Sequence, residues 1–120
     1  MVVMRYSPYN RAVKKVLDSG VLGDIINIQH IEPVGWQHFA HSYVRGNWKN
    51  EATTSFSLMA KCCHDLDILS YYMGKDTPKK LSSFGSLAHF KPSKKPKEAG
   101  HAKRCTECAY ERKCPYSAKK

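Results

Sequence analysis

The segment 57–69, SLMAKCCHDLDIL, constrains the fold most, because it sets a lysine, two cysteines, a histidine and two aspartates inside a helical pattern. Apolar or thiol side chains recur there and just beyond at a spacing of three and four residues, which marks one helical face: Met59, Cys62, Leu66, Leu69 and Met73. The pattern predicts a helix from about 55 to 72, ended by Gly74.

Lys61, His64 and Asp65 are expected to lie beside this apolar stripe, again three and four residues apart. Charged groups near a helix's core edge are costly to bury unless they are paired, so their grouping indicates a functional site. A structural interpretation has about equal support. In it, Lys61 and Asp65 form a solvated pair and His64 is a hydrogen-bonded core histidine.

The length and composition limit the class of protein. A chain of 120 residues forms one domain at most. No run of about 18 apolar residues is present, so we expect no membrane span, and the N-terminus does not resemble a secretory signal. Five cysteines, an odd number with two adjacent on a helix, favour a reducing compartment over a disulfide framework. We therefore expect a cytoplasmic protein.

The net charge of +10 is concentrated near the C-terminus, where residues 91–120 carry ten Lys/Arg and three Glu. Such a basic extension could contact nucleic acid or an acidic partner. It lacks the interleaved aromatic residues of nucleic-acid modules, so a solvated tail is the commoner interpretation.

The order of elements predicts an α/β fold. We expect strands at 2–6, 25–31 and 81–90, a helix that starts at Ser7-Pro8 and ends near Gly20, an aromatic and histidine-rich loop at 32–54, and a Pro/Lys/Gly linker at 91–100. A structureless loop of that length and aromatic content favours a binding loop. Strand, helix and strand together form the unit from which α/β sheets are built.

Several motifs resemble a known enzyme family. Arg5-Tyr6-Ser7-Pro8, Lys14 through Leu17, and the segment 19–25, SGVLGDI, resemble the opening of the substrate domain of the Gfo/Idh/MocA oxidoreductases, the glucose-fructose oxidoreductase and inositol dehydrogenase family. The segment 64–69, HDLDIL, is similar to that family's helix motif, in which an aspartate follows a histidine by three residues. The resemblance spans roughly residues 2–90.

The resemblance implies hydride transfer between NAD or NADP and a sugar, polyol or related carbonyl compound. It also implies an open, mostly antiparallel or mixed sheet with helices on one face, and homo-oligomers formed through such sheets. His64 takes the position of the family's histidine, which binds the reacting hydroxyl and transfers a proton. Lys61 lies beside it as a second catalytic candidate, and Asp67 is the motif's aspartate.

Two departures limit what this chain does alone. Many family members have an aspartate four residues before the histidine, where this chain has Ala60, and the usual catalytic lysine lies in the nucleotide-binding half. No G-x-G-x-x-G fingerprint occurs, so no cofactor-binding residue is assigned here. We expect residues 1–90 to be a partial substrate domain without the Rossmann domain, inactive by itself, and 91–120 a basic, cysteine-containing tail.

Arg45, Trp48 and Asp67 are the candidate substrate contacts. Arginine and aromatic side chains suit oxyanions and sugar faces. Ordinary loop packing explains Arg45 and Trp48 equally well.

The C-terminal cysteines, Cys105, Cys108 and Cys114, form a C-x2-C-x5-C pattern that indicates a zinc site. Cys63, His101 or a residue past the chain end could be the fourth ligand. Iron–sulfur binding has less support, and three free thiols are the structural alternative. The competing functional hypothesis is therefore a small zinc-stabilised module whose basic tail contacts nucleic acid or a protein.

Overall fold

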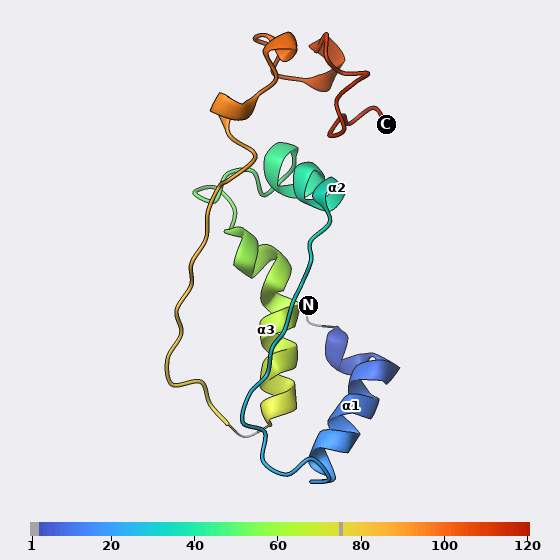
Figure 1. Ribbon diagram of the computed structural model, residues 1–120, viewed down its shortest axis with the longest axis vertical. Coiled ribbons are helices and arrows are strands. Elements are labelled where there is room, and N and C mark those ends of the chain that lie inside the picture. Colours follow the sequence, from blue (N-terminus) through green and yellow to red (C-terminus); the bar gives the residue numbers. More distant parts are fainter. Residues whose placement is uncertain (1–2, 75) are drawn as a thin grey trace. The chain divides into compact units, whose positions relative to one another are not determined.

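The computed structural model describes residues 3–74 and 76–120. Its helices are α1 (Pro8–Asp18), α2 (Trp36–Phe39) and α3 (Ser57–Met73), and short 3-10 turns are found at Met4–Tyr6, Pro92–Lys94, Lys97–Ala99 and Cys105–Glu107 (Figure 1). A wider helical turn, Ala40–Arg45, continues α2. None of the helices in the described ranges is long and apolar enough to cross a membrane.

The chain divides into two compact units, each assembled from two separate stretches. The α1–α3 unit contains the described residues up to Pro33 together with Asn50–Leu81. The α2 unit contains Val34–Lys49 and Ser82–Lys120. Each unit is described by itself below.

The two long helices begin and end where the sequence predicts. Ser7 is extended at the start of α1 and Pro8 occupies its first turn, where a missing N–H costs nothing. After the helix Gly20 has φ +73°. Gly74 ends α3 with φ +69°, a left-handed conformation that glycine adopts without strain.

The buried face of α3 differs from the predicted one. Ile68 and Asp65 are the buried residues of this helix, with 1% and 7% of their surface exposed. Met59 and Leu66, which belong to the predicted apolar stripe, are 53% and 42% exposed. The helix therefore packs with the face of Asp65 and Ile68 inward, and the predicted apolar stripe is wrong at Met59 and Leu66.

The predicted α/β fold with an open sheet is wrong for the described residues, because they contain no β-strand. Residues 25–31 and 81–90 have no regular structure, and Ile26 and Phe84 in them are 91% and 96% exposed. A β-branched composition favours extended backbone, but a strand exists only when a second backbone pairs with it.

The predicted first strand is also wrong. Met4–Tyr6 forms a 3-10 turn that leads into α1, with the Tyr6 N–H donating to the Val3 carbonyl at 3.1 Å. The side chain of Asn10 secures this turn, since its Nδ2 donates to the Met4 carbonyl at 2.8 Å. Residue 2 lies outside the described residues.

The α2 unit is built around aromatic rings. Phe39 stacks on Phe90 with centroids 5.7 Å apart, and Tyr116 meets Phe90 and Trp36 edge-on at 5.0 and 5.3 Å. The predicted loop at 32–54 is thus partly helical, and several of its rings contact one another or rings of the C-terminal segment. Gly46 follows the wide turn, where a Cβ would collide with the His41 carbonyl oxygen, so only glycine fits.

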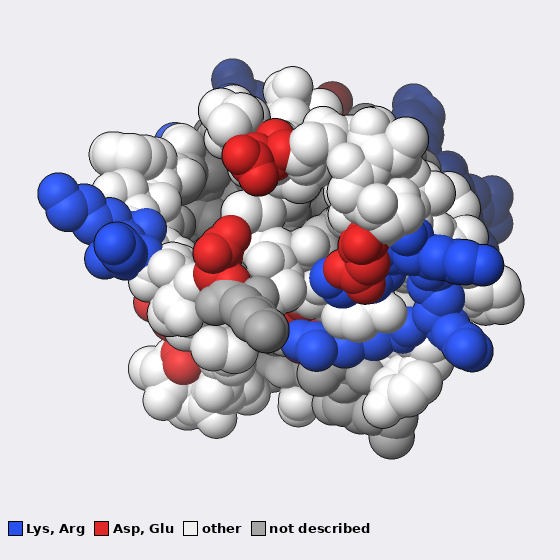
Figure 2. Space-filling model, turned by 90° about the horizontal axis from the view of Figure 1, so that it is seen from below, with Lys and Arg blue, Asp and Glu red and all other residues white. Residues whose placement is uncertain are grey.

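The two units differ in charge. By sequence the α2 unit holds twelve Lys/Arg and three Glu, a net of +9, whereas the α1–α3 unit has a net of +1. Figure 2 shows a face on which acidic and basic side chains are interspersed. The excess positive charge of the chain therefore belongs to one unit.

Candidate functional site

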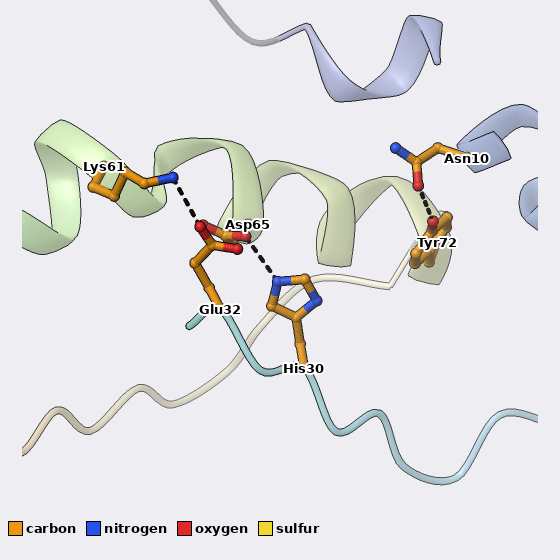
Figure 3. A network of polar contacts seen from close by, with 6 residues as sticks. All are labelled: Asn10, His30, Glu32, Lys61, Asp65 and Tyr72. Atoms are coloured by element: carbon orange, nitrogen blue, oxygen red, sulfur yellow. Dashed lines mark hydrogen bonds and ion pairs between the residues drawn. The ribbon is translucent and has the colours of Figure 1, made fainter. Parts of the chain in front are cut away.

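Two charged residues of α3, Lys61 and Asp65, pair with the segment that follows α1. Lys61 Nζ donates to Glu32 Oε1 at 2.8 Å, and Asp65 Oδ1 lies 2.8 Å from His30 Nε2 (Figure 3). Residues 30–32 thus run along α3 and contact it twice. The expected alternative, a solvated pair between Lys61 and Asp65, is not the arrangement found.

Lys61 is a fixed cation in this arrangement. Its hydrogen bond to Glu32 raises the pKa of the ammonium group above its usual value. The amine therefore stays protonated at neutral pH, so it can donate hydrogen bonds and stabilise negative charge but cannot accept a proton. Burial, reinforced by nearby Asp65, raises the pKa of the neighbouring Cys62 thiol, which excludes a ready thiolate nucleophile there.

His64 has an unsatisfied ring nitrogen. Its Nδ1 is buried and has no hydrogen-bond partner among the described residues. A buried polar atom without a partner costs about 1–3 kcal/mol, so native proteins keep few of them without a functional reason. The structural interpretation of His64 as a satisfied core histidine does not describe this residue.

Asp67 is held by Arg5. The guanidinium donates from Nε and Nη2 to the two carboxylate oxygens at 2.7 and 2.6 Å, a bidentate pair that also places Arg5 over the Tyr71 ring at 5.2 Å. The same hydrogen bond holds the pKa of Asp67 below its usual range. Asp67 is therefore an ionised carboxylate, and its predicted substrate contact would use its remaining lone pairs.

A further contact ties α1 to the C-terminal half of α3. Tyr72 Oη donates to Asn10 Oδ1 at 2.6 Å, and Asn10 is 5% exposed (Figure 3). Burial raises the pKa of the Tyr72 hydroxyl. This contact fixes the helix that carries His64 against α1.

The sequence did not indicate four partners of this site: Arg5, His30, Glu32 and Asn10. They lie 29 to 62 residues from the α3 side chains or Tyr72 that they contact. Arg5 stood out only as part of a family motif, and the other three sit in segments whose pattern carries no sign of a distant partner.

Arg45 and Trp48 belong to the α2 unit, where each has a packing role. Arg45 Nη1 donates to the main-chain oxygen of Tyr116. The Trp48 ring lies 6.0 Å from that of Tyr43, and the main-chain N–H of Trp48 donates to the Ser42 carbonyl at 3.1 Å. Their role as substrate contacts stays a prediction.

The predicted zinc site has no support among the described residues, where no group of three or more His, Cys, Asp or Glu side chains is arranged to hold a metal ion. Cys105, Cys108 and Cys114 all line one cavity of the α2 unit, and the Cys105 thiol accepts a hydrogen bond from Ala118 N–H at 3.5 Å. Cys63 belongs to the other unit. We therefore assign no step to a metal.

The chain's own residues do not fit a dinucleotide either. Its sequence has no glycine-rich turn leading into a helix, the arrangement that usually cradles a pyrophosphate.

Comparison with known proteins identifies the domain. The profile described as "Oxidoreductase family, C-terminal alpha/beta domain" matches residues 14–110. A Bacillus subtilis (strain 168) protein named "Putative oxidoreductase YteT" is 25% identical over 116 residues, which are 93% of this chain and 26% of that protein. The chain thus spans about a quarter of the length of this relative. No solved structure matches the chain at a significant level.

The matched profile covers most of the chain and includes α3, with its His64 and Asp67. The resemblance drawn from the sequence motifs is thereby confirmed, and the chain belongs to the C-terminal domain of the Gfo/Idh/MocA oxidoreductase family.

Proposed function

We propose that this chain supplies the substrate-contacting residues of an NAD(P)-dependent oxidoreductase that interconverts an alcohol and a carbonyl group on a sugar, polyol or related compound. The coarse class, an oxidoreductase-family domain, comes from the matched profile. The substrate class and the cofactor come from the family resemblance of the α3 motif. The relative's printed name, an oxidoreductase, is consistent with this proposal.

The unpaired Nδ1 of His64 carries the proposal. An imidazole exchanges protons near neutral pH, and general acid–base catalysis needs such a group within hydrogen-bond reach of the reacting hydroxyl. Nδ1 is buried and no described residue bonds to it, so a substrate hydroxyl that reached this nitrogen would displace no protein partner. In alcohol oxidation His64 takes the hydroxyl proton, and in the reverse direction it returns it.

The neighbours of His64 have supporting roles. Lys61 keeps its positive charge through Glu32, so it can stabilise the oxygen as it becomes more negative when the proton leaves. Asp65 is tied to His30 and Asp67 to Arg5, which fixes the part of α3 that directly follows His64. These are positioning contacts, and they leave proton transfer to His64.

Hydride acceptance belongs to the nicotinamide in NAD(P)-linked oxidoreductases. No residue of this chain is assigned to the cofactor, so we expect the 120-residue chain alone to bind neither NAD(H) nor NADP(H). Assembly into homo-oligomers stays a prediction from the family resemblance.

The test is turnover by the oxidoreductase that contains this chain, followed by NAD(P)H absorbance over a panel of sugars and polyols. His64→Gln should lower kcat by about a hundredfold or more. His41→Gln, at an exposed histidine of the α2 unit, is the matched control and should stay near wild type. Equal kcat in the two variants, or no oxidation of any polyol or sugar, would contradict the proposal.

A further inference from the structure

The α2 unit contains a cavity of about 670 Å³ that the proposed function does not use. Its wall is formed by the turn Ala40–Arg45 and by segments between 89 and 116. The volume lies within the range of small-molecule sites, roughly 300–1,000 Å³. All of its lining residues belong to one unit, and none lies on α3.

Cations surround this cavity without acidic partners. Six of the lining residues are basic: Arg45, Lys91, Lys94, Lys95, Lys103 and Arg104. No Asp or Glu is among the described residues that line it. The ion pair seen in the described part of this unit lies elsewhere, between Lys119 and Glu111 at 3.9 Å. Like charges gathered around one hollow repel, and a bound anion would relieve that repulsion.

Two of these basic side chains form hydrogen bonds with main-chain oxygens of the protein, which stabilise the cavity wall. Arg45 donates to the Tyr116 main-chain oxygen, and Lys95 Nζ donates to the Ala102 carbonyl at 2.6 Å. Among the described residues, no hydrogen bond or ion pair is formed by the side chains of Lys91, Lys94, Lys103 and Arg104. These four side chains are the groups available to a ligand.

The remaining wall is apolar and aromatic. Ala40 and Ala99 are 1% and 8% exposed, and the edge-on pair of Phe90 and Tyr116 adds two rings. Tyr116 is fixed in turn, because its hydroxyl lies 2.8 Å from His89 Nε2. A cavity with a fixed aromatic wall and free cations matches a ligand that has both a ring and a negative charge.

We propose that this cavity binds a small organic anion, a phosphate ester or carboxylate carried on a ring, independently of the chemistry at His64. The anionic group pairs with Lys103 and Arg104 and is approached by Lys91 and Lys94, while the ring packs on Phe90 and Tyr116. A polynucleotide fits less well, because it needs an extended basic track with bases stacked along it. Here the cations converge on one hollow.

Calorimetric titration of the full 120-residue chain with phenyl phosphate tests the proposal, with inorganic phosphate and phenol as the two half-ligands. Glucose 6-phosphate and glucose form a second pair, which separates sugar phosphates from aryl phosphates. We expect both organic phosphates to bind more tightly than inorganic phosphate and the two neutral compounds not to bind. Binding of phenol or glucose as tight as that of the esters, or no binding of either ester at millimolar concentration, would overturn the proposal.

Two variants that remove the same amount of charge distinguish a specific anion site from general electrostatic attraction to the basic unit. K103A/R104A removes two cavity cations and should weaken phenyl phosphate binding by about tenfold or more. R112A/K113A removes the same charge from the same unit at residues outside the cavity wall, and should change binding by less than about twofold. Equal weakening in both variants would contradict a built site. So would tighter binding of single-stranded DNA that phenyl phosphate does not displace.

The cavity thiols provide a readout that needs no variant. Cys105, Cys108 and Cys114 line the cavity, whereas Cys62 and Cys63 lie on α3 in the other unit. In N-ethylmaleimide labelling followed by peptide mass spectrometry, phenyl phosphate should slow the modification of the three cavity cysteines several-fold and leave Cys62 and Cys63 unchanged. Uniform labelling rates with and without phenyl phosphate would contradict occupancy of this cavity.

Discussion

His30 and Asp65 are joined by a contact of 2.8 Å between Nε2 and Oδ1, although 35 residues separate them. Asp65 is 7% exposed, so the hydrogen bond with His30 replaces part of the hydration that its carboxylate loses inside the α1–α3 unit. The contact fixes the irregular segment after α1 against the helix that carries His64.

Replacing His30 should therefore destabilise the unit. His30→Ala leaves a buried carboxylate without its partner, and we expect the free energy of unfolding to fall by about 1–3 kcal/mol. His101→Ala, at an exposed histidine, is the control and should have little effect. Urea denaturation followed by circular dichroism measures both. The double variant H30A/D65N should recover part of the lost stability. Equal stability of His30→Ala and His101→Ala would refute the prediction.

The Arg5–Asp67 pair should make the free energy of unfolding depend on pH in the acidic range. Because Arg5 lowers the pKa of Asp67 in the folded state, the pair contributes stability above the unfolded pKa of about 4, and this contribution is lost as pH falls through the lower folded value. Asp67→Asn should reduce the free energy of unfolding at pH 7, and the difference from wild type should vanish in strong acid.

Asp18 offers a matched control for this pH dependence. It pairs with Lys14 at 2.6 Å, but its side chain is 61% exposed, so solvent screens the pair. Asp18→Asn should change stability little at any pH. If the difference between Asp67→Asn and wild type is the same at pH 7 and in strong acid, the linkage to Arg5 is wrong.

We expect His64 to lower the thermal stability of the folded chain. Because its buried Nδ1 has no partner, His64→Leu removes an unsatisfied polar atom, and we expect Tm to stay level or rise. The same variant should abolish turnover in the oxidoreductase that contains the chain. Thermal unfolding and NAD(P)H absorbance on one preparation give both values. A large fall in Tm would assign His64 to packing.

The ring of Tyr116 should contribute more to the free energy of unfolding than its hydroxyl does. Tyr116→Phe loses only the 2.8 Å contact with His89 and should cost about 0.5–1.5 kcal/mol. Tyr116→Ala also removes the edge-on contacts with Phe90 and Trp36, so its cost should be at least twice as large. Guanidinium unfolding followed by tryptophan fluorescence compares the two, and equal costs would show that the hydroxyl dominates.

The helices could be predicted because their signals are local. Ser7-Pro8 before α1 and Gly74 after α3 act through their own backbone conformations, and the structure confirms both ends. The strands could not be predicted in the same way. Ile26 and Phe84 lie in segments of suitable composition, but ladder pairing depends on a second backbone that local sequence does not specify.

The candidate site was predictable in part. The grouping of Lys61, His64 and Asp65 on one side of a helix is visible in the sequence, but which side is buried depends on what covers it. Asp65 became a buried residue because the His30 ring forms a hydrogen bond with its carboxylate, so a polar face replaced the expected apolar stripe at the contact. No periodicity in the chain reports a partner 35 residues away.

The α2 unit joins residues 34–49 to residues 82–120, so the C-terminal residues pack as part of this unit and are not an appendage. A protease or a premature stop codon that removed everything after residue 90 would take Tyr116 away from Trp36 and Arg45. The shortened polypeptide would present uncovered rings to solvent and should aggregate. The basic end of this chain therefore protects its solubility in two ways, through its charge and as a cover for aromatic surface.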